Sequence, residues 1–411
     1  MTTAAPTETA QGGVAQHGAK AHSDGGWGLV PVQTRSERFR STDVSAFPAV
    51  TGREAEWRYT PVARLAALLD GALSPAEPVV EFDAAEGYVV ERIAREDALI
   101  GSAGTPEDRA SANAWGAFQQ ALKVTVAGEA PGALTLRRSG FGSEPAAAHT
   151  VVEAVAGSRG LVIIDSSGPA RLAENVEILV REGARLTVVS VQEWDDDAVH
   201  LSSHFARVEN GAELKHVVVT LGGDIVRLNP AVHLAEEGAA VDALGVYFAD
   251  SGQHLEQQVY VFHDAPHSRS RVTYKGALQG ASARTVWIGD VLIGRRATGT
   301  DSYEQNRNLV LTEGARADSV PNLEIETGDI VGAGHASATG RFDDEQLFYL
   351  MARGIPEDEA RRLVVRGFLA EIVQQIGEPE IEQRLTAAIE AELAGTAAAA
   401  AAARPTTETG V

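Results

Sequence analysis

Two pairs of histidines stand four residues apart, a spacing that suggests metal chemistry: His200 with His204, and His263 with His267. On a helix this spacing places both imidazoles on one face, as zinc proteases require. Both pairs lie in strand-rich sequence, however, where four residues extend over roughly 13 Å, too far for two ligands of one ion. Neither pair encloses the glutamate of the protease motif. We therefore predict that each pair has a role in a turn or on a sheet and binds no metal.

Three adjacent acids, Asp195, Asp196 and Asp197, form the other group that could hold a cation. Successive side chains of a strand point to opposite faces, so three neighbours need not converge, and a solvated loop is the better interpretation. The sequence has no phosphate-binding loop, dinucleotide fingerprint or nucleophile elbow in the strand context that each of them needs. These patterns predict a protein that is not an enzyme.

His335 differs from the other histidines because glycines surround it, in the stretch GAGHASATG at positions 332–340. Glycines allow close backbone approach and leave the imidazole uncovered. An uncovered imidazole can bind a metal or exchange a proton near neutral pH. His335 lies where β-rich sequence gives way to helical sequence, so a purely structural histidine at this junction remains the alternative.

Composition limits the chemistry further, since the 411 residues include no cysteine and carry a formal net charge of −22. Without thiols the chain can form no disulfide, no zinc–thiolate site and no iron–sulfur cluster held by its own cysteines. Its negative charge makes nucleic acid a poor candidate partner. No stretch approaches the roughly 18 apolar residues of a membrane span, and residues 1–26 lack the apolar segment of a secretory signal. We expect a cytoplasmic protein that binds no membrane.

Changes in residue pattern divide the chain into five segments. Residues 1–26 and the Ala-rich residues 396–411 are predicted to be disordered tails. Residues 27–122 mix short helices with loops, and positions 106–122 are predicted to form a helix with Trp115, Phe118 and Leu122 on one face. Residues 123–330 are rich in short β runs, and residues 331–395 form a helical domain.

The β-rich segment repeats a turn at a nearly constant interval. Each copy is a glycine followed by alanine: Gly183, Gly211 and Gly238, which are 28 and 27 residues apart, and Gly314. Such a glycine can adopt a positive φ before a new apolar run begins. A fixed period in the twenties with short strands is typical of a solenoid. The pattern favours a parallel β-helix, with a β-sandwich as the main alternative.

The last helical segment predicts three helices, beginning near Asp343, Pro356 and Pro379. The second carries two adjacent apolar rows, a face wider than one neighbouring helix would cover. Packing against a core explains most of this face, and an exposed part would dock another protein.

Several long stretches resemble the SufB/SufD family of iron–sulfur cluster assembly proteins. They are residues 254–278, from His254 through HDAPHSRSR to Leu278; residues 301–311; residues 317–326; and residues 347–355, with Gly334-His335 between the last two. Upstream, GREAEWRYT at positions 52–60 is similar to the N-terminal signature of the SufD branch. The resemblance runs in order through roughly residues 50–376.

The resemblance implies a right-handed parallel β-helix between an N-terminal helical region and a C-terminal helical domain. It implies pairing with SufB through the β-helix and docking of the SufC ATPase through the C-terminal helices, within a SufBCD complex that assembles and transfers iron–sulfur clusters. The docking candidates are Leu347, Phe348, Met351, Phe368 and Ile372. The resemblance is also compatible with a flavin bound to the complex.

One departure from the family pattern bears on the chemistry. Many relatives have Cys-Ser-His where this chain has Ala333-Gly334-His335. The missing thiol disfavours the SufB branch and leaves His335 as the one candidate for cluster assembly at the SufB interface and for metal ligation. The chain alone is expected to bind no cofactor, so its role would be that of a scaffold. A homodimeric scaffold that works without SufB and a polysaccharide-active β-helix enzyme remain the alternatives.

Overall fold

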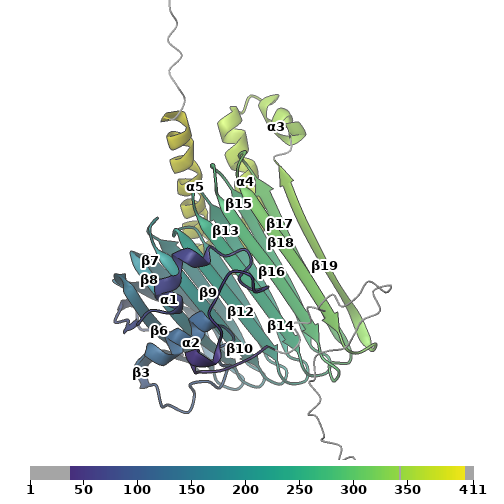
Figure 1. Ribbon diagram of the computed structural model, residues 1–411. Helices are drawn as coiled ribbons and strands as arrows, with labels where there is room; N and C mark the ends of the chain where they lie inside the picture. Colours follow the sequence, from purple (N-terminus) through teal and green to yellow (C-terminus); the bar gives the residue numbers. More distant parts are fainter. Residues whose placement is uncertain (1–37, 342–343, 403–411) are drawn as a thin grey trace, which may run out of the picture. The chain divides into compact units, whose positions relative to one another are not determined.

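Two sheets wind together into a parallel β-solenoid, in which the chain passes back and forth between them (Figure 1). The computed structural model describes residues 38–341 and 344–402. From Arg40 onward they belong to one compact unit. The predicted tail at 1–26 lies outside the described residues, as do positions 403–411 of the second tail.

Each coil adds one strand to each sheet, and neighbouring coils pair in parallel except at the N-terminal end. The first sheet contains β1 (Ser74–Pro75), β3 (Tyr88–Ala94), β4 (Gln120–Val126), β6 (Gly142–Ala154), β8 (Ala170–Val180), β10 (Val199–Val208), β12 (Ile225–Leu234), β14 (His254–His263), β16 (Arg284–Ile293) and β18 (Arg316–Ile325). The second contains β2 (Val79–Glu81), β5 (Glu129–Ser139), β7 (Arg159–Gly168), β9 (Arg185–Trp194), β11 (Glu213–Thr220), β13 (Ala240–Ala249), β15 (Arg269–Leu278), β17 (Thr300–Val310) and β19 (Ile330–Arg341). The prediction of a parallel β-helix rather than a sandwich is confirmed.

The repeated glycine turn forms one corner of the solenoid, between a strand of the first sheet and the next strand of the second. Gly183, Gly211 and Gly238 have φ values of 65°, 59° and 71°. Each of their N–H groups donates to the carbonyl oxygen just before the corner residue of the next coil. His267 takes the same place one coil later, with a φ of 58°. Gly314 does not belong to this stack, because it lies between β17 and β18 on another corner.

Both outer faces of the solenoid are covered by other parts of the chain. The N-terminal segment supplies η1 (Val44–Ala46), η2 (Val62–Arg64), α1 (Ala66–Leu69) and α2 (Arg109–Ala117), and its apolar side chains pack on the first sheet. The C-terminal helices α4 (Glu357–Val373) and α5 (Pro379–Ala402) pack on the second sheet, through residues such as Val217 and Leu369. Because neighbouring strand residues point to opposite faces and both faces are covered, short runs such as Val217-Val218-Val219 are apolar and buried at every position.

Three boundaries differ from those predicted. The helix expected at 106–122 ends at Ala117, and Leu122 lies in β4, because the residues from Gln120 onward pair with β3 and β6. The strands also continue to Arg341, so the segment containing His335 belongs to β19 rather than to the helical segment proposed from residue 331. The backbone of α5 remains helical to Ala402, within the tail predicted from 396.

Candidate functional site

The two ends of the solenoid differ in how their last strands are paired. At the N-terminal end, β3 pairs antiparallel with β4 and β2 pairs antiparallel with β5, which ends both sheets. At the other end, β18 and β19 are the last strands of their sheets, and Figure 1 shows β19 at the margin of the fold. Side chains of β18 and β19 are mostly exposed or half-buried, whereas those of earlier coils are mostly buried. Among the described residues no strand pairs with the outer edges of β18 and β19, so this open end, formed by these two strands, presents unpaired strand edges.

Apolar side chains add to the unpaired edges at the open end. Val331 on β19 is 76% exposed, and Ile325 on β18 and Tyr303 on β17 are also exposed. Exposed apolar side chains beside a free strand edge are typical of a surface that pairs with another chain.

His335 lies at this open end. It pairs in register with Glu304 of β17, so both side chains point to the interior between the two sheets. The His335 side chain remains 45% exposed because no further coil covers it. Its Nδ1 lies 3.8 Å from Oε1 of Glu304, which is only 1% exposed.

The sequence did not single out Glu304, because most of its neighbours on β17 are polar as well. Neither of its carboxyl oxygens accepts a hydrogen bond from a side chain of the described residues. Burial, followed by the charge of Asp290, raises the pKa of Glu304 to about 8, and the backbone of Asn322 offsets only part of that rise. At neutral pH this carboxyl is therefore mostly protonated.

Three of the four paired histidines have structural partners inside the solenoid. His200 Nε2 lies 3.0 Å from Glu174, and His204 Nδ1 lies 2.9 Å from Nε2 of His216. His263 contacts the hydroxyls of Ser268 and Ser270 at 2.8 and 2.9 Å. Burial lowers the pKa of His263 to about 3, so its imidazole is neutral at physiological pH.

Within residues 38–341 and 344–402, no three histidine or acidic side chains converge as they would around a metal ion. Asp195, Asp196 and Asp197 are exposed in the turn that follows β9. They do not meet His335, and neither do the two histidine pairs. None of the helices described is long and apolar enough to cross a membrane.

The five docking candidates on the C-terminal helices differ in exposure. Phe348 on α3 (Asp344–Met351) is 73% exposed, and Met351 is exposed as well. Leu347 and Ile372 are buried, and Phe368 is partly buried under Lys275. Tyr349, which the sequence did not single out, is exposed beside Phe348. The structure thus leaves two of the five, with Tyr349, available to another protein.

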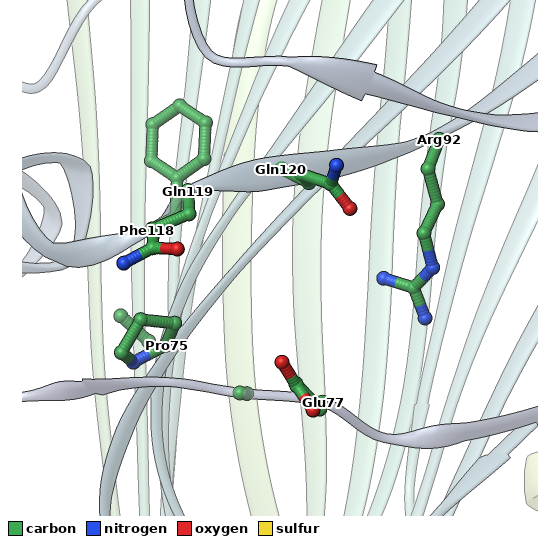
Figure 2. A pocket seen from close by; sticks show the side chains of 8 residues that line it. Pro75, Glu77, Arg92, Phe118, Gln119 and Gln120 are labelled. Carbon is green, nitrogen blue, oxygen red and sulfur yellow. The ribbon is translucent and has the colours of Figure 1, made fainter.

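A cavity of about 320 Å³ lies among β1, β3, β4 and β6, toward the N-terminal end of the solenoid. Its lining residues are Pro75, Ala76, Glu77, Arg92, Phe118, Gln119, Gln120 and Ala147. Figure 2 shows Arg92 and Glu77 on opposite sides of the opening, with their charged groups directed into it. These residues belong to the opposite end of the sheets from His335, so the cavity is not part of the same site.

Comparison with known proteins agrees with this fold. Residues 137–368 match the family model for "SUF system FeS cluster assembly, SufBD core domain". A SufBD family iron–sulfur cluster assembly protein of Mycobacterium tuberculosis strain H37Rv is 50% identical over 370 residues, which cover 87% of this chain and 93% of that protein.

Mycobacterium leprae has two proteins of the same family name that are similar to this chain. One is 49% identical over 365 residues, covering 86% of this chain and 93% of that protein. The other is 33% identical over 201 residues, covering 49% of this chain but only 23% of its own length. The matched core domain and the identity over most of both lengths show that the chain belongs to the SufBD family of iron–sulfur cluster assembly proteins.

Proposed function

We propose that this chain is a SufD-type scaffold subunit, which supports iron–sulfur cluster assembly by completing a SufBCD complex in the cytoplasm. It pairs with SufB through the open end and docks the SufC ATPase through α3. The observation that carries this proposal is the open end itself: two unpaired strand edges, exposed apolar side chains and a half-exposed His335. Pairing with a second solenoid would continue both sheets and cover these groups.

The absence of cysteine supports an auxiliary role in cluster assembly. Iron–sulfur clusters are held mainly by thiolates, with histidine replacing a minority of ligands. A chain that offers only an imidazole at its open end needs a partner that supplies thiolates. The presence of a second, more distant SufBD family protein in M. leprae supports a partner of the same family.

The pairing is tested with Val331→Asp, which places a charge on the exposed edge strand. The matched control is Val89→Asp on β3 at the opposite end, where the side chain is 54% exposed. We expect Val331→Asp, but not Val89→Asp, to abolish co-purification with the SufB-type partner in size-exclusion chromatography. An unchanged complex with Val331→Asp would refute pairing through the open end.

The same chromatography separates the heterodimer from the homodimeric alternative. If the chain alone elutes as a dimer that Val331→Asp dissociates, and the dimer persists when the second family member is co-expressed, the homodimeric scaffold is correct.

Docking of the ATPase needs point variants, because α4 and α5 cover apolar residues of the second sheet. Deleting the helices would expose Val217, Val219 and Phe248, so the truncated chain would aggregate whatever its binding activity. We expect Phe348→Asp to prevent co-purification of SufC while the SufB-type partner remains bound. Phe82→Asp, at another exposed phenylalanine, is the control. Retention of SufC by Phe348→Asp would exclude α3 as the docking surface.

A further inference from the structure

The cavity near the N-terminal end of the solenoid lies where two strands share one edge of β6. Along this edge β1 pairs with Ala146 and Ala147, whereas β4 begins to pair at Thr150. Among the described residues no strand pairs with Ala148 and His149 on the same edge. The interruption of the sheet leaves room for the cavity of about 320 Å³, a volume near the lower limit of small-molecule sites in proteins.

Two opposite charges face each other across the opening of this cavity. Arg92 belongs to β3, and Glu77 lies between β1 and β2. Figure 2 shows their charged groups directed into the opening from opposite sides. Within residues 38–341 and 344–402, neither side chain forms an ion pair or a hydrogen bond, whereas the nearby Lys123 and Glu91 pair at 3.2 Å. Two unpaired, opposite charges at one opening suit a ligand that carries both charges itself.

The apolar part of the cavity lining is held firmly in place. Phe118 is 1% exposed, and its ring stacks on the ring of His149 with the centroids 4.2 Å apart. The guanidinium of Arg95 lies 5.2 Å from the centroid of the same Phe118 ring. Pro75 and Ala147 complete the apolar lining. A preformed apolar surface below a charged opening is the usual design of a small-molecule site.

We propose that this cavity binds a free α-amino acid in its zwitterionic form. Arg92 binds the carboxylate, because a planar guanidinium presents paired N–H donors to two oxygens. Glu77 accepts hydrogen bonds from the ammonium group. Gln120 projects from the same face of the β3–β4 pair as Arg92, so its side-chain amide donates a further hydrogen bond to the carboxylate. The site is independent of the proposed function, because its residues lie at the opposite end of the sheets from His335.

The charges and the size of the cavity disfavour other ligands. Glu77 repels phosphates and dicarboxylates, and Arg92 repels polyamines and metal cations. A dinucleotide is too large for a cavity of about 320 Å³. The apolar lining around Phe118 favours an aliphatic amino-acid side chain, which makes leucine the probe of choice.

The test is calorimetric titration of L-leucine into the full chain and into single variants. Arg92→Gln and Glu77→Gln remove the two charges. Arg159→Gln and Glu86→Gln are the matched controls, because these side chains are exposed and do not line the cavity. We expect each site variant to weaken leucine binding at least about tenfold, the effect of losing one charge-assisted hydrogen bond. The controls should match the wild type.

Two derivatives of the probe test each charge separately. L-Leucine methyl ester lacks the carboxylate, and N-acetyl-L-leucine lacks the ammonium group. The wild type should bind leucine more tightly than either derivative. Arg92→Gln should lose the preference over the methyl ester, and Glu77→Gln should lose the preference over the acetyl derivative. Preferences that remain in both variants would overturn the assignment of the two charges.

Both Arg92 and Glu77 are exposed, so the variants should fold like the wild type, which circular dichroism checks. Leucine binding that both variants retain at the strength of the wild type would overturn the inference. The lack of saturable binding to the wild-type chain by leucine and by every other common amino acid, titrated in the same way, would also overturn it.

Discussion

The guanidinium of Arg227 lies 3.7 Å above the indole ring of Trp57 and joins the N-terminal segment to the first sheet. The same guanidinium donates to Asp108 at 2.8 Å and to Glu256 at 3.1 Å, and all three charged groups are buried. Trp57 thus covers a buried ion network that would otherwise face solvent.

Replacing Trp57 with alanine should therefore destabilise the fold. We expect a loss of about 3–5 kcal/mol, the usual range for removing a buried tryptophan, and rapid proteolysis within residues 40–70. Trp57→Phe retains a ring over Arg227 and should lose clearly less. Equal stability of Trp57→Ala and the wild type in urea unfolding would contradict this account.

Lys275 should determine how firmly α4 is held on the second sheet. Its side chain is 2% exposed, donates to the carbonyl of Phe368 at 3.0 Å, pairs with Glu371 and lies 4.7 Å from the Phe368 ring centroid. Lys275→Met keeps the length of the side chain but removes these interactions, so we expect faster hydrogen exchange in α4. The control is Lys215→Met, whose exposed bond to Gln375 should matter little. Identical exchange in the two variants would refute the role of Lys275.

Glu304 should make stability depend on pH. Its pKa is raised from an ordinary value of 4.5 to about 8, so between these values the unfolded chain ionises this group while the folded chain keeps it protonated. Stability is therefore lost as pH rises through this window. Glu304→Gln should equal the wild type near pH 4 and exceed it by on the order of 4 kcal/mol at pH 8. The measurement is urea unfolding at both pH values, and a constant difference would show that Glu304 is not responsible.

The absence of thiols predicts a colourless protein. After anaerobic incubation with iron and sulfide and removal of unbound material, the isolated chain should show no visible absorption and no acid-labile sulfide. In complex with the SufB-type partner and SufC it should become brown. A stable, stoichiometric cluster on the isolated chain would disprove the idea that a partner supplies the thiolates.

His335→Ala should lower the rate of cluster assembly in that complex without weakening the complex or the fold. Its side chain is half-exposed, and its Nδ1 lies 3.8 Å from Oε1 of Glu304, beyond hydrogen-bond distance. A normal rate of assembly, or failure to fold, would instead favour a purely structural histidine.

The sequence by itself favoured the parallel solenoid over a β-sandwich, because the signal for it is local. Gly183, Gly211 and Gly238 each adopt the positive φ that a corner requires, and the spacing between these glycines equals the length of one coil. The missing cysteines likewise needed no structure to exclude a self-held cluster.

Only the tertiary structure decided which side chains meet and which are exposed, because both depend on contacts between coils. Glu304 and His335 meet because strand pairing places β19 beside β17 in one register, and the length of the intervening turns sets that register. Pairing with β3 and β6 likewise made a strand of the residues around Leu122. Exposure also depends on tertiary contacts. Ile372 and Phe348 are both apolar helix residues, but the second sheet covers only Ile372. The residues of that sheet that lie opposite Ile372 are distant from it in the sequence.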